Sequence, residues 1–553
     1  MQYGSLLYEI LGRPARARRP THAWRYARFA KICRSRRREP AAESATLLRI
    51  TRERLDWWNA LADDPYVTTI DAVIDQPGTL IDGIWTGGDE VLSTIDPATG
   101  EEYGRIHTSR TSDVDRAVAA ARAAARDWSR TSPSERGALL SRWAQLIFEN
   151  QERLAAIEAR NVGKPLSAAR MNIIIAGSIL AYTAGGADKL TGATLPVRQP
   201  EFFGYTVREP YGVCAIVLPW NVPALLSAAN LAPALAAGNT VVLKPSEVAP
   251  LVVHALVELA EAAGLPPGVL NVLTGVGADL GAALVSHPGV DHVSFVGSVA
   301  TGRLVMQGAA RHLTPIKLEL GGKSPNIVFP DADLDVAIPT IVRSITENAG
   351  QNCNAGSRLL VHRSIIGEVR DQVLARMADI RLGAWDEDLD MGPLVNTVQH
   401  QRVSGIVDAA LRDGAELLIG GGRPQGRGAG HFLEPTVLEV ADRGAPVIGQ
   451  EIFGPVLTLE TFSDEADALH LANGTDFGLL ACVWTQDVSR ALRMAAEIQA
   501  GQVSVNQFAD AGVIGLPFNM YKASGFSSGN GYRALYEFTR EKAVAVKLLG
   551  SRD

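Results

Sequence analysis

A single cysteine lies in a polar segment, NAGQNCNAGSR, that runs from residue 348 to residue 358. Cys353 stands between two asparagines, and Gly350 and Gly356 lie further out on either side. A nucleophilic cysteine has to be ionised, accessible and close to donors that stabilise the oxyanion formed when it attacks a carbonyl. Polar neighbours favour an accessible thiol, and glycines let the backbone approach a substrate closely. The segment is therefore a candidate nucleophile site, and a buried structural cysteine is the competing interpretation.

A candidate base stands in the segment LELGGKSP, residues 318–325. Glu319 lies between two leucines at the end of an expected strand and is followed by Gly321 and Gly322. A carboxyl group held in apolar surroundings has a raised pKa and can act as a general base near neutral pH. A solvated glutamate at a strand end is the competing interpretation.

Three further segments offer groups that bind anions or hydroxyls. In PWN, residues 219–221, the side-chain amide of Asn221 can donate to an oxyanion. In LKPSE, Lys244 and Glu247 stand three residues apart, a pair that suits ribose hydroxyls. FVGS, residues 295–298, ends a strand where a helix starts, and free N–H groups there bind pyrophosphate. No GxGxxG motif occurs in a first βα unit, so the usual dinucleotide fingerprint is missing.

The elements that position these groups alternate between short apolar runs and helical patterns. Helices are expected from Pro223 and Ala249, each directly after an apolar run. Continuous apolar strands separated by helices indicate parallel strands in a doubly wound α/β sheet. A second series of βα units starts in residues 324–335. The expected strands of the first series are residues 213–220, 240–245, 271–275 and 292–297.

Isolated extended segments flank these units. FFGYTVREP, residues 202–210, alternates as an antiparallel ribbon does, and residues 543–549 form a short strand after a helix. Such pieces at a domain margin commonly join subunits. Ser132, Pro133 and Glu135 form a capping-box start of a helix, and residues 421–432 read as an exposed loop.

Composition excludes several classes of protein. The length of 553 residues predicts two or three domains, and the net charge of -7 argues against a nucleic-acid footprint across the body of the chain. The four cysteines stand too far apart for a metal clip or a dense disulfide framework, which favours a reducing compartment and a cytoplasmic protein. The longest uncharged stretch, residues 172–187, is shorter than the roughly 20 apolar residues of a membrane span, so we expect none.

The first forty residues differ from the rest, with eleven Lys or Arg against two acids. A segment that is rich in arginine and poor in acids can be a transit peptide or a nucleic-acid arm. A disordered tail and upstream sequence read from an early start codon are the competing interpretations.

Six motifs in register carry a resemblance. PWN, LKPSE, FVGS, LELGGKSP, the cysteine segment and EIFGPV, residues 451–456, follow one another in the order and spacing of the aldehyde dehydrogenase superfamily. The resemblance spans about residues 75–550. It implies an α/β fold with two Rossmann-like doubly wound domains and a small β oligomerisation ribbon. The implied segments are a basic, disordered N-terminal extension (1–75), a NAD-binding domain (76–194 and 212–320), a catalytic domain (321–522), and the ribbon with the C-terminal segment (195–211 and 523–553).

The resemblance also implies a mechanism. Cys353 is the nucleophile, Glu319 the general base, and Asn221 with the backbone N–H of Cys353 forms the oxyanion hole. The thiolate attacks an aldehyde, hydride passes from the thiohemiacetal to NAD, and Glu319 activates the water that releases the acid from the thioester. Glu319 argues against the CoA-acylating branch. The alternative is a non-catalytic or weakly active NAD-binding member of the same fold.

The implied ligands are NAD and an aldehyde, with no metal, nucleic acid or membrane, in a homodimer or homotetramer. Because a carboxylate on the ribose repels a 2′-phosphate, Glu247 favours NAD, and NADP stays open. Small residues at substrate positions predict a roomy tunnel for a bulky or cyclic aldehyde, lined by Val222, Ala229, Gly512 and Phe518. The implied cofactor contacts are Trp220, Lys244, Ser246, Glu247, Gly277, Phe295, Gly297, Ser298, Leu320, Gly321, Glu451 and Phe453.

Three departures from the family pattern concern turnover. The usual PFGG is PFNM at residues 517–520, a lysine of the pattern is Asn230, and the glutamate after the SG pair is Gly529. In the family that lysine and that glutamate act together in moving protons away from the general base. Their loss predicts slow proton release after competent acylation.

Overall fold

The computed structural model describes residues 74–508 and 513–548. Chain contacts divide the protein into Met1–Thr68 and Thr69–Asp553, and every described residue belongs to the second unit. The expected N-terminal extension therefore lies outside the described residues except for its last two positions, and Gly512 lies outside them as well.

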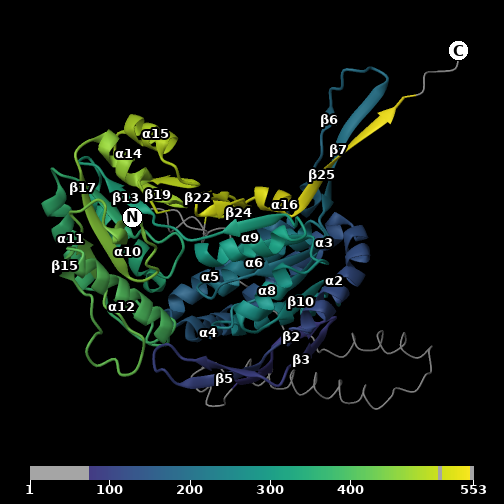
Figure 1. The fold of residues 1–553 in the computed structure, drawn as a ribbon, viewed down its shortest axis with the longest axis horizontal. Coiled ribbons are helices and arrows are strands. Elements are labelled where there is room, and N and C mark those ends of the chain that lie inside the picture. Colours follow the sequence, from purple (N-terminus) through teal and green to yellow (C-terminus); the bar gives the residue numbers. More distant parts are fainter. Residues whose placement is uncertain (1–73, 509–512, 549–553) are drawn as a thin grey trace, which may run out of the picture. The chain divides into compact units, whose positions relative to one another are not determined.

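The first sheet has eight strands in the order β23-β12-β11-β8-β9-β10-β2-β3 (Figure 1). Neighbours from β12 to β10 are parallel, and antiparallel strands β23, β2 and β3 complete the two margins. The five parallel strands match the four apolar runs and the Glu319 segment that the sequence predicts. The strands are β2 (Thr79–Ile81), β3 (Ile84–Thr86), β8 (Val213–Val217), β9 (Thr240–Lys244), β10 (Leu270–Leu273), β11 (His292–Val296), β12 (Ile316–Glu319) and β23 (Gly525–Phe526).

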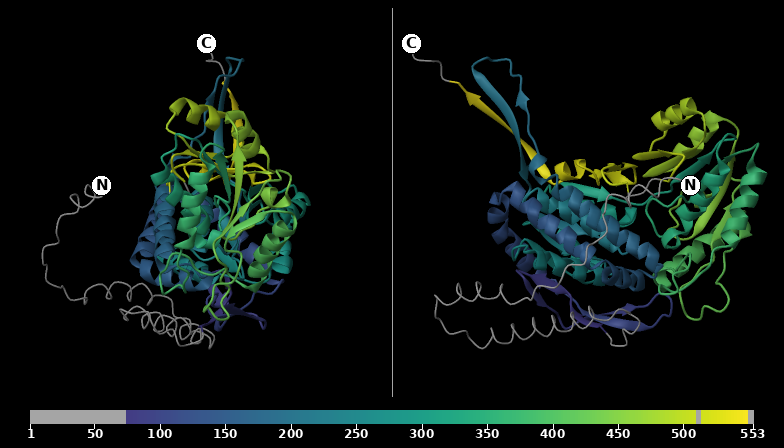
Figure 2. Two further views of the ribbon diagram at one scale, coloured as in Figure 1. Left: turned by 90° about the vertical axis from the view of Figure 1, so that its left-hand side faces the viewer. Right: turned by 180° about the vertical axis from the view of Figure 1, so that it is seen from behind.

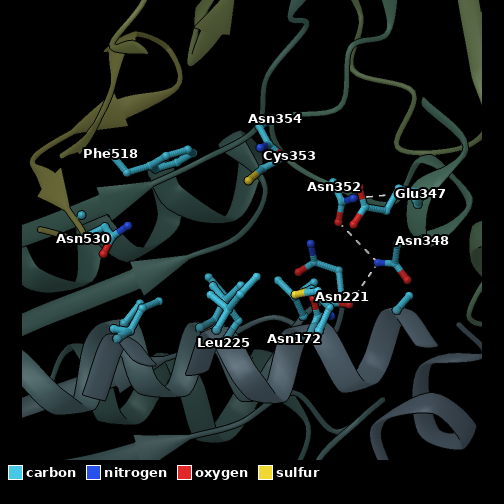
Figure 3. A pocket seen from close by; sticks show the side chains of 18 of the residues that line it. Asn172, Asn221, Leu225, Glu347, Asn348, Asn352, Cys353, Asn354, Phe518 and Asn530 are labelled. Carbon is cyan, nitrogen blue, oxygen red and sulfur yellow. Dashed lines mark hydrogen bonds between the residues drawn. The ribbon is translucent and has the colours of Figure 1, made fainter. Parts of the chain in front are cut away.

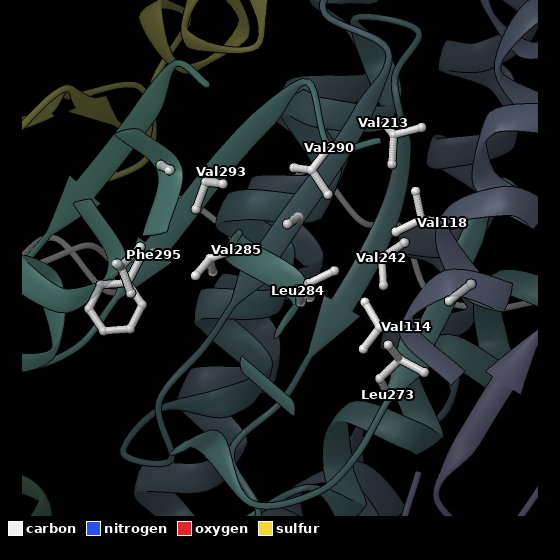
Figure 4. Close-up of a cluster of buried hydrophobic side chains, with 14 of the residues drawn as sticks. Val114, Val118, Val213, Val242, Leu273, Leu284, Val285, Val290, Val293 and Phe295 are labelled. Carbon is white, nitrogen blue, oxygen red and sulfur yellow. The ribbon is translucent and has the colours of Figure 1, made fainter. Parts of the chain in front are cut away.

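Both faces of this sheet are covered, which is why its strands read as continuous apolar runs. On one face Val213, Val242 and Val293 pack against α2 (Asp113–Arg130), α8 (Ala282–Val285) and α9 (Val299–Ala310), as Figure 4 shows. On the other face lies α6 (Pro223–Ala236), which begins at the predicted residue. The other helices of this layer are α3 (Pro133–Glu149), α5 (Leu166–Ala184) and α7 (Leu251–Ala263), which pack against α6, and α4 (Gln151–Val162), which packs against α5 and α7.

Two helices of this layer test sequence predictions. Helix α3 begins with the capping box, because Ser132 accepts from the Glu135 backbone N–H and Glu135 accepts from Ser132 in return. Helix α5 belongs to a helical segment, Leu166–Lys189, that is long and apolar enough to cross a membrane by length and composition. It extends beyond the uncharged stretch, residues 172–187, at both ends. Core helices meet the same criteria, and α5 packs against α3, α4 and α6.

The second sheet has seven strands in the order β15-β16-β17-β14-β13-β19-β20, parallel except for β15. Its strands are β13 (Pro325–Val328), β14 (Arg358–His362), β15 (Glu416–Ile419), β16 (Thr436–Glu439), β17 (Val456–Phe462), β19 (Leu480–Trp484) and β20 (Gln502–Val505). Buried side chains of this sheet pack against α10 (Leu334–Thr346) and α11 (Ile366–Ala378) in one cluster and against α14 (Glu465–Asn473) and α15 (Val488–Glu497) in another. Helices α12 (Thr397–Arg412) and α13 (Pro446–Gly449) enclose a third cluster.

A three-stranded ribbon extends away from the two sheets (Figures 1 and 2). Strand β7 (Phe202–Pro210) pairs antiparallel along its whole length with β25 (Thr539–Lys547), and β6 (Thr194–Leu195) pairs with the other edge of β7. Strand β25 begins four residues earlier than the sequence predicts. The segment 523–553 also contributes β23, which extends the first sheet beside Glu319, so this segment is not confined to the ribbon.

Short elements complete the described chain. A three-stranded sheet holds β1 (Ile74–Pro77), β5 (Glu102–His107) and β4 (Val91–Ile95), in that order. Two pairs consist of β18 (Phe477–Gly478) with β22 (Tyr521–Lys522) and of β21 (Phe518–Asn519) with β24 (Ser528–Gly529). Helix α16 (Arg533–Glu537) precedes β25.

Candidate active site

The parallel strands of the first sheet determine where a dinucleotide can bind. The chain runs from β8 outward through β9 to β10, then returns to the other side of β8 as β11 and continues to β12. Ligands of open α/β sheets bind outside the carboxyl ends of the strands at such a reversal. Asn221 follows β8, and Gly297 with Ser298 follows β11, so these residues flank the reversal point.

The cysteine loop is held in an unusual backbone conformation. After α10 ends, Asn348, Ala349 and Gly350 have φ angles of 51°, 53° and 67°. A non-glycine residue in this left-handed region costs on the order of 1–2 kcal/mol. A side chain at Gly350 would collide with the carbonyl oxygen of Gly454, in the EIFGPV segment. The strained turn thereby fixes the approach of the chain to Cys353.

The glycines of this loop do not serve the purpose that the sequence suggests. A Cβ atom at Gly356 would meet the side chains of Ser344 and Asn326, and one at Gly350 would meet protein backbone. Both glycines therefore permit close packing within the protein, and the interpretation that they let the backbone approach a substrate is corrected.

Asn221 is anchored from three directions. Its Nδ2 donates to the Gln351 carbonyl at 2.9 Å. Its own backbone carbonyl accepts from Lys164 Nζ at 2.9 Å and from Asn348 Nδ2 at 3.0 Å. An amide nitrogen carries two hydrogens, so a second N–H remains for an oxyanion.

A buried ion pair that the sequence analysis missed supports this anchor. Lys164 Nζ lies 2.8 Å from Glu158 Oε1, and both side chains are almost completely buried. Glu158 also accepts from Asn172 Nδ2 at 2.9 Å and from the Ala224 N–H at 3.2 Å, in the first turn of α6. In sequence the pair flanks the end of a helix and resembles ordinary surface charges, so no sequence signal distinguishes it.

Glu319 has a different environment from the apolar one that the sequence predicts. It forms an ion pair with Lys317, two residues earlier on β12, because alternate residues of a strand share a face. Lys317 Nζ also donates to Asn230 Oδ1 at 2.8 Å. A Cβ atom at Gly529 would lie 2.6 Å from Glu319 Oε1, so the carboxylate packs directly on that glycine. A buried cation therefore lies beside this carboxylate, where the sequence predicts apolar surroundings.

The Cys353 thiol is not ionised by its surroundings. Burial, together with the nearby negative charges of Glu319 and Glu451, raises the pKa of the thiol to about 12. The thiol is therefore protonated at neutral pH in this geometry. Attack on a carbonyl requires either a base for the proton or a positive charge beside the sulfur.

Two cavities meet at these groups. One has a volume of about 120 Å³ and the other about 230 Å³. The residues common to their linings are Asn221, Val222, Leu226, Glu319 and Cys353. The nucleophile candidate and the base candidate therefore stand where two ligands can meet.

The smaller cavity contains three of the predicted substrate positions: Val222, Ala229 and Phe518. Figure 3 shows Cys353 and Asn221 facing this space, with Phe518 across it. Aliphatic side chains that the sequence analysis did not name make up much of the remaining wall. These are Met171, Ile175, Ile179, Leu225 and Leu226. They lie on α5 and α6, and only the packing of the two helices reveals that they share a surface.

The larger cavity gathers seven of the predicted cofactor residues. Ser298 caps α9 by accepting from the Thr301 N–H, and Trp220 meets Phe453 edge to face at 5.5 Å. Glu451 accepts from the Gly322 N–H at 3.2 Å, and burial raises the pKa of its carboxyl group. The seven are Trp220, Gly297, Ser298, Leu320, Gly321, Glu451 and Phe453.

The other predicted cofactor residues do not line this cavity. Lys244 and Glu247 form an ion pair at 2.7 Å, and Gly277 lies beside both. Although burial opposes it, the Lys244 charge lowers the pKa of Glu247, so the carboxylate is ionised. Ser246 accepts from the Val248 N–H and so shapes the same turn. Phe295 lies in the core, with its ring packed beneath Gly297.

Comparison with known proteins agrees with this geometry. Residues 85–544 match the model of a family described as the aldehyde dehydrogenase family, which is most of the chain. The chain belongs to the aldehyde dehydrogenase family. The resemblance predicted from six motifs is confirmed.

Two characterised relatives are similar along nearly their whole length. A (Z)-2-((N-methylformamido)methylene)-5-hydroxybutyrolactone dehydrogenase of Acinetobacter baylyi is 39% identical over 85% of this chain and 96% of the relative. A betaine aldehyde dehydrogenase of Bacillus subtilis is 38% identical over 84% of this chain and 96% of the relative.

Solved structures confirm the predicted α/β fold. A putative aldehyde dehydrogenase from Burkholderia cenocepacia superposes with a TM-score of 0.82 at 43% identity, covering 85% of this chain and 99% of that chain. A betaine aldehyde dehydrogenase from Staphylococcus aureus in complex with NAD+ superposes with a TM-score of 0.84 at 35% identity, covering 86% and 96%. The predicted cofactor, NAD, agrees with this neighbour.

Family membership decides between the two functions that the sequence leaves open. This aldehyde dehydrogenase is an oxidoreductase that converts an aldehyde to a carboxylic acid, and the non-catalytic alternative is not favoured. Among the residues that the structure describes, no group of three or more His, Cys, Asp or Glu is arranged to hold a metal ion.

Proposed function

We propose that this aldehyde dehydrogenase oxidises a bulky or cyclic aldehyde with NAD, using Cys353 as nucleophile, Glu319 as general base and Asn221 as oxyanion donor. One observation carries the proposal: these three side chains line both cavities, and few other residues do so. A substrate in one cavity and a cofactor in the other would meet at the sulfur.

The chain's own residues account for each step. The Cys353 thiol first loses its proton to solvent water. As the sulfur then bonds to the aldehyde carbon, the carbonyl oxygen becomes an oxyanion, which accepts from the second Asn221 N–H and the Cys353 N–H. The nicotinamide, when bound, supplies the acceptor for the hydride that leaves this carbon. Glu319 then takes a proton from water as the water oxygen bonds to the thioester carbon. The carbon–sulfur bond breaks, and the acid and the thiolate form.

The residues of the larger cavity fit a dinucleotide. Ser298 and the N-terminus of α9 would hold the pyrophosphate, because free N–H groups there attract anions. Glu451 and Phe453 would hold the nicotinamide ribose. Lys244 and Glu247 would hold the adenine ribose, and the ionised Glu247 would repel a 2′-phosphate. This repulsion supports NAD over NADP.

The wall of the smaller cavity supports the proposed substrate class. Val222 and Ala229 are small, and the part of the wall that α5 and α6 contribute is mainly aliphatic, whereas asparagines such as Asn348, Asn352 and Asn530 line other parts. Such a surface gains little from a two-carbon aldehyde and more from a large apolar one. The relative from Acinetobacter baylyi is named for a hydroxybutyrolactone, which is a cyclic substrate.

We also propose that the ribbon of β6, β7 and β25 joins subunits into a homodimer or homotetramer in the cytoplasm. Strand β25 is an edge strand with an unpaired side, which is suited to pairing with another chain. The apolar side chains of Phe203 and Val546 are exposed on this ribbon. Light scattering of the purified protein would measure the assembly directly.

The function is tested by following NADH or NADPH formation from a panel of small, long-chain, aromatic and cyclic aldehydes. We expect the highest kcat/KM with a bulky aldehyde and NAD. The Cys353→Ala variant should be inactive, and Cys214→Ala is a matched control, because Cys214 is fully buried in β8. Acetaldehyde as the best substrate would exclude the proposed class, and an active Cys353→Ala variant would exclude the mechanism.

A further inference from the structure

The EIFG segment, residues 451–454, is held by side chains of helix α12. Arg402 donates through Nη1 to the Ile452 carbonyl at 2.5 Å and through Nη2 to the Glu451 carbonyl at 2.8 Å. A guanidinium group carries its donors in a rigid planar fork, so two bonds from one group restrict both acceptors. Arg402 therefore fixes the direction of two adjacent peptide groups.

Two further side chains of α12 contact the end of this segment. Gln399 Nε2 donates to the Phe453 carbonyl at 2.7 Å. A Cβ atom at Gly454 would lie 2.7 Å from the Val403 side chain, so these two residues are in close contact. Positions three and four apart are neighbours on a helix, so residues 399, 402 and 403 present one face. Each residue of the EIFG segment therefore contacts the same face of α12.

The segment has a backbone conformation that its residue types do not favour. Phe453 has a φ angle of 58°, in the left-handed region that residues other than glycine seldom adopt. In this conformation the Phe453 ring meets Trp220 edge to face, and both residues line the larger cavity. A disfavoured conformation persists only where its surroundings hold it. The bond from Gln399 to the Phe453 carbonyl acts at the strained residue itself.

The EIFG segment also contacts the two loops of the active site. Its Glu451 carboxylate accepts from the Gly322 N–H at 3.2 Å, shortly after β12 ends. A Cβ atom at Gly350 would collide with the Gly454 carbonyl, so the loop that carries Cys353 packs against the same segment. The segment therefore lies between α12 and the nucleophile, and a change in its position would reach both the larger cavity and the cysteine loop.

We propose that Gln399 and Arg402 are positioning residues for hydride transfer. They hold the EIFG segment in the conformation that places the nicotinamide end of the cofactor against Cys353. The proposal rests on the proposed roles of Glu451 and Phe453 at the nicotinamide ribose. Because both α12 side chains line the larger cavity, direct binding of the cofactor is the competing role. Their donors are directed at protein carbonyls, which supports positioning.

The test separates cofactor affinity from hydride transfer in the full-length protein, with the variants Gln399→Leu and Arg402→Met. The Kd for NAD+, from quenching of tryptophan fluorescence, should stay nearly unchanged. The rate of the first NADH turnover at saturating NAD+ should fall roughly 10²-fold, the loss that a misplacement of about 1 Å can cause. An aldehyde deuterated at its carbonyl carbon should then give a primary isotope effect on kcat, because hydride transfer has become the slowest step. Arg402→Lys keeps a donor and should restore part of the rate, and Arg412→Met, at an exposed arginine of α12, is the matched control.

Two outcomes would overturn the positioning role. A raised Kd for NAD+, with or without slower hydride transfer, would assign the two side chains to cofactor binding, and wild-type kinetics in both variants would leave them without a role. Thermal unfolding identifies a variant that does not fold, and the other variant then carries the test. If Glu451→Ala leaves hydride transfer intact, the proposed role of the segment fails. If Glu451→Ala slows hydride transfer and the α12 variants do not, only the positioning role fails.

Discussion

The Asn221 side-chain amide donates to the Gln351 carbonyl at 2.9 Å, two residues before Cys353. This bond ties the loop after β8 to the cysteine loop after α10, so the oxyanion donor and the nucleophile move together. Gln351 is itself fixed, because its Oε1 accepts from the Val395 N–H and its Nε2 donates to the Asn348 carbonyl. The catalytic geometry is therefore established between the two sheets by hydrogen bonds to backbone atoms.

Replacing Asn221 by Ala removes an oxyanion donor and the tie to Gln351. We expect kcat to fall on the order of 10²–10³-fold, as loss of one oxyanion donor typically causes. Asn473→Ala is a control, because it removes a side-chain amide that also donates to a backbone carbonyl but lines neither cavity. Steady-state kinetics with a preferred aldehyde provide the measurement, and equal effects of the two variants would argue against a special role for Asn221.

Glu319→Gln should separate the two halves of the reaction. Acylation and hydride transfer precede the water step, so an NADH burst should persist while acid release slows. The amide is nearly isosteric and can still accept from Lys317, which limits structural damage. Stopped-flow absorbance distinguishes burst from steady state, and normal steady-state turnover would show that Glu319 is not the base.

The reactivity of Cys353 should depend on pH and on the cofactor. Because the pKa of the thiol is raised to about 12, its thiolate fraction and its alkylation rate should rise about tenfold per pH unit up to that value. A positively charged nicotinamide bound in the larger cavity, which Cys353 lines, would favour the thiolate, so NAD+ should accelerate alkylation at pH 8. Iodoacetamide labelling with and without NAD+ measures this, and a cofactor-independent rate would contradict it.

Breaking the Glu158–Lys164 pair should destabilise the protein and disturb Asn221. Lys164→Met leaves a buried carboxylate without its cation, which typically costs about 3–5 kcal/mol. Denaturant unfolding measures this loss, and kcat should fall because the Asn221 carbonyl loses a donor. Lys189→Met breaks an exposed pair and should leave stability nearly unchanged. In the double variant Lys164→Met with Glu158→Gln, no charge is left unpaired, so much of the stability should return.

Val222 should control access for large substrates. It lines both cavities, so Val222→Phe would narrow the space beside Cys353. We expect kcat/KM for aromatic or cyclic aldehydes to fall at least tenfold, while that for acetaldehyde changes little or rises. A uniform decrease for all aldehydes would instead indicate damage to the nucleophile.

The sequence predicts the fold well where burial is continuous. The apolar runs from 213 and 240 are β8 and β9, because parallel strands covered on both faces contain few polar residues. Cys353 and Glu319 can also be recognised in the sequence, because each is a reactive residue type in an unusual context. The cysteine stands between two asparagines and the glutamate between two leucines.

The sequence predicts less where a charged side chain is buried by distant elements. Lys317 lies in the run IKLE, where alternation suggests a solvent-facing residue, yet α6, β11 and Phe538 enclose it. Glu158 and Lys164 are hidden from sequence analysis in the same way. The departures at Asn230 and Gly529 are visible in the sequence, whereas the contacts of Lys317 with Glu319 and Asn230 become visible only in three dimensions.

The most direct test of the central mechanism is to trap the covalent intermediate on Cys353. Glu319→Gln is mixed with an accepted aldehyde and NAD+, quenched in acid, digested with pepsin, and analysed by mass spectrometry. The mechanism predicts that the peptide containing Cys353 gains the mass of the acyl group, in an amount equal to the NADH burst. Formation of NADH with an unmodified Cys353 peptide would contradict it.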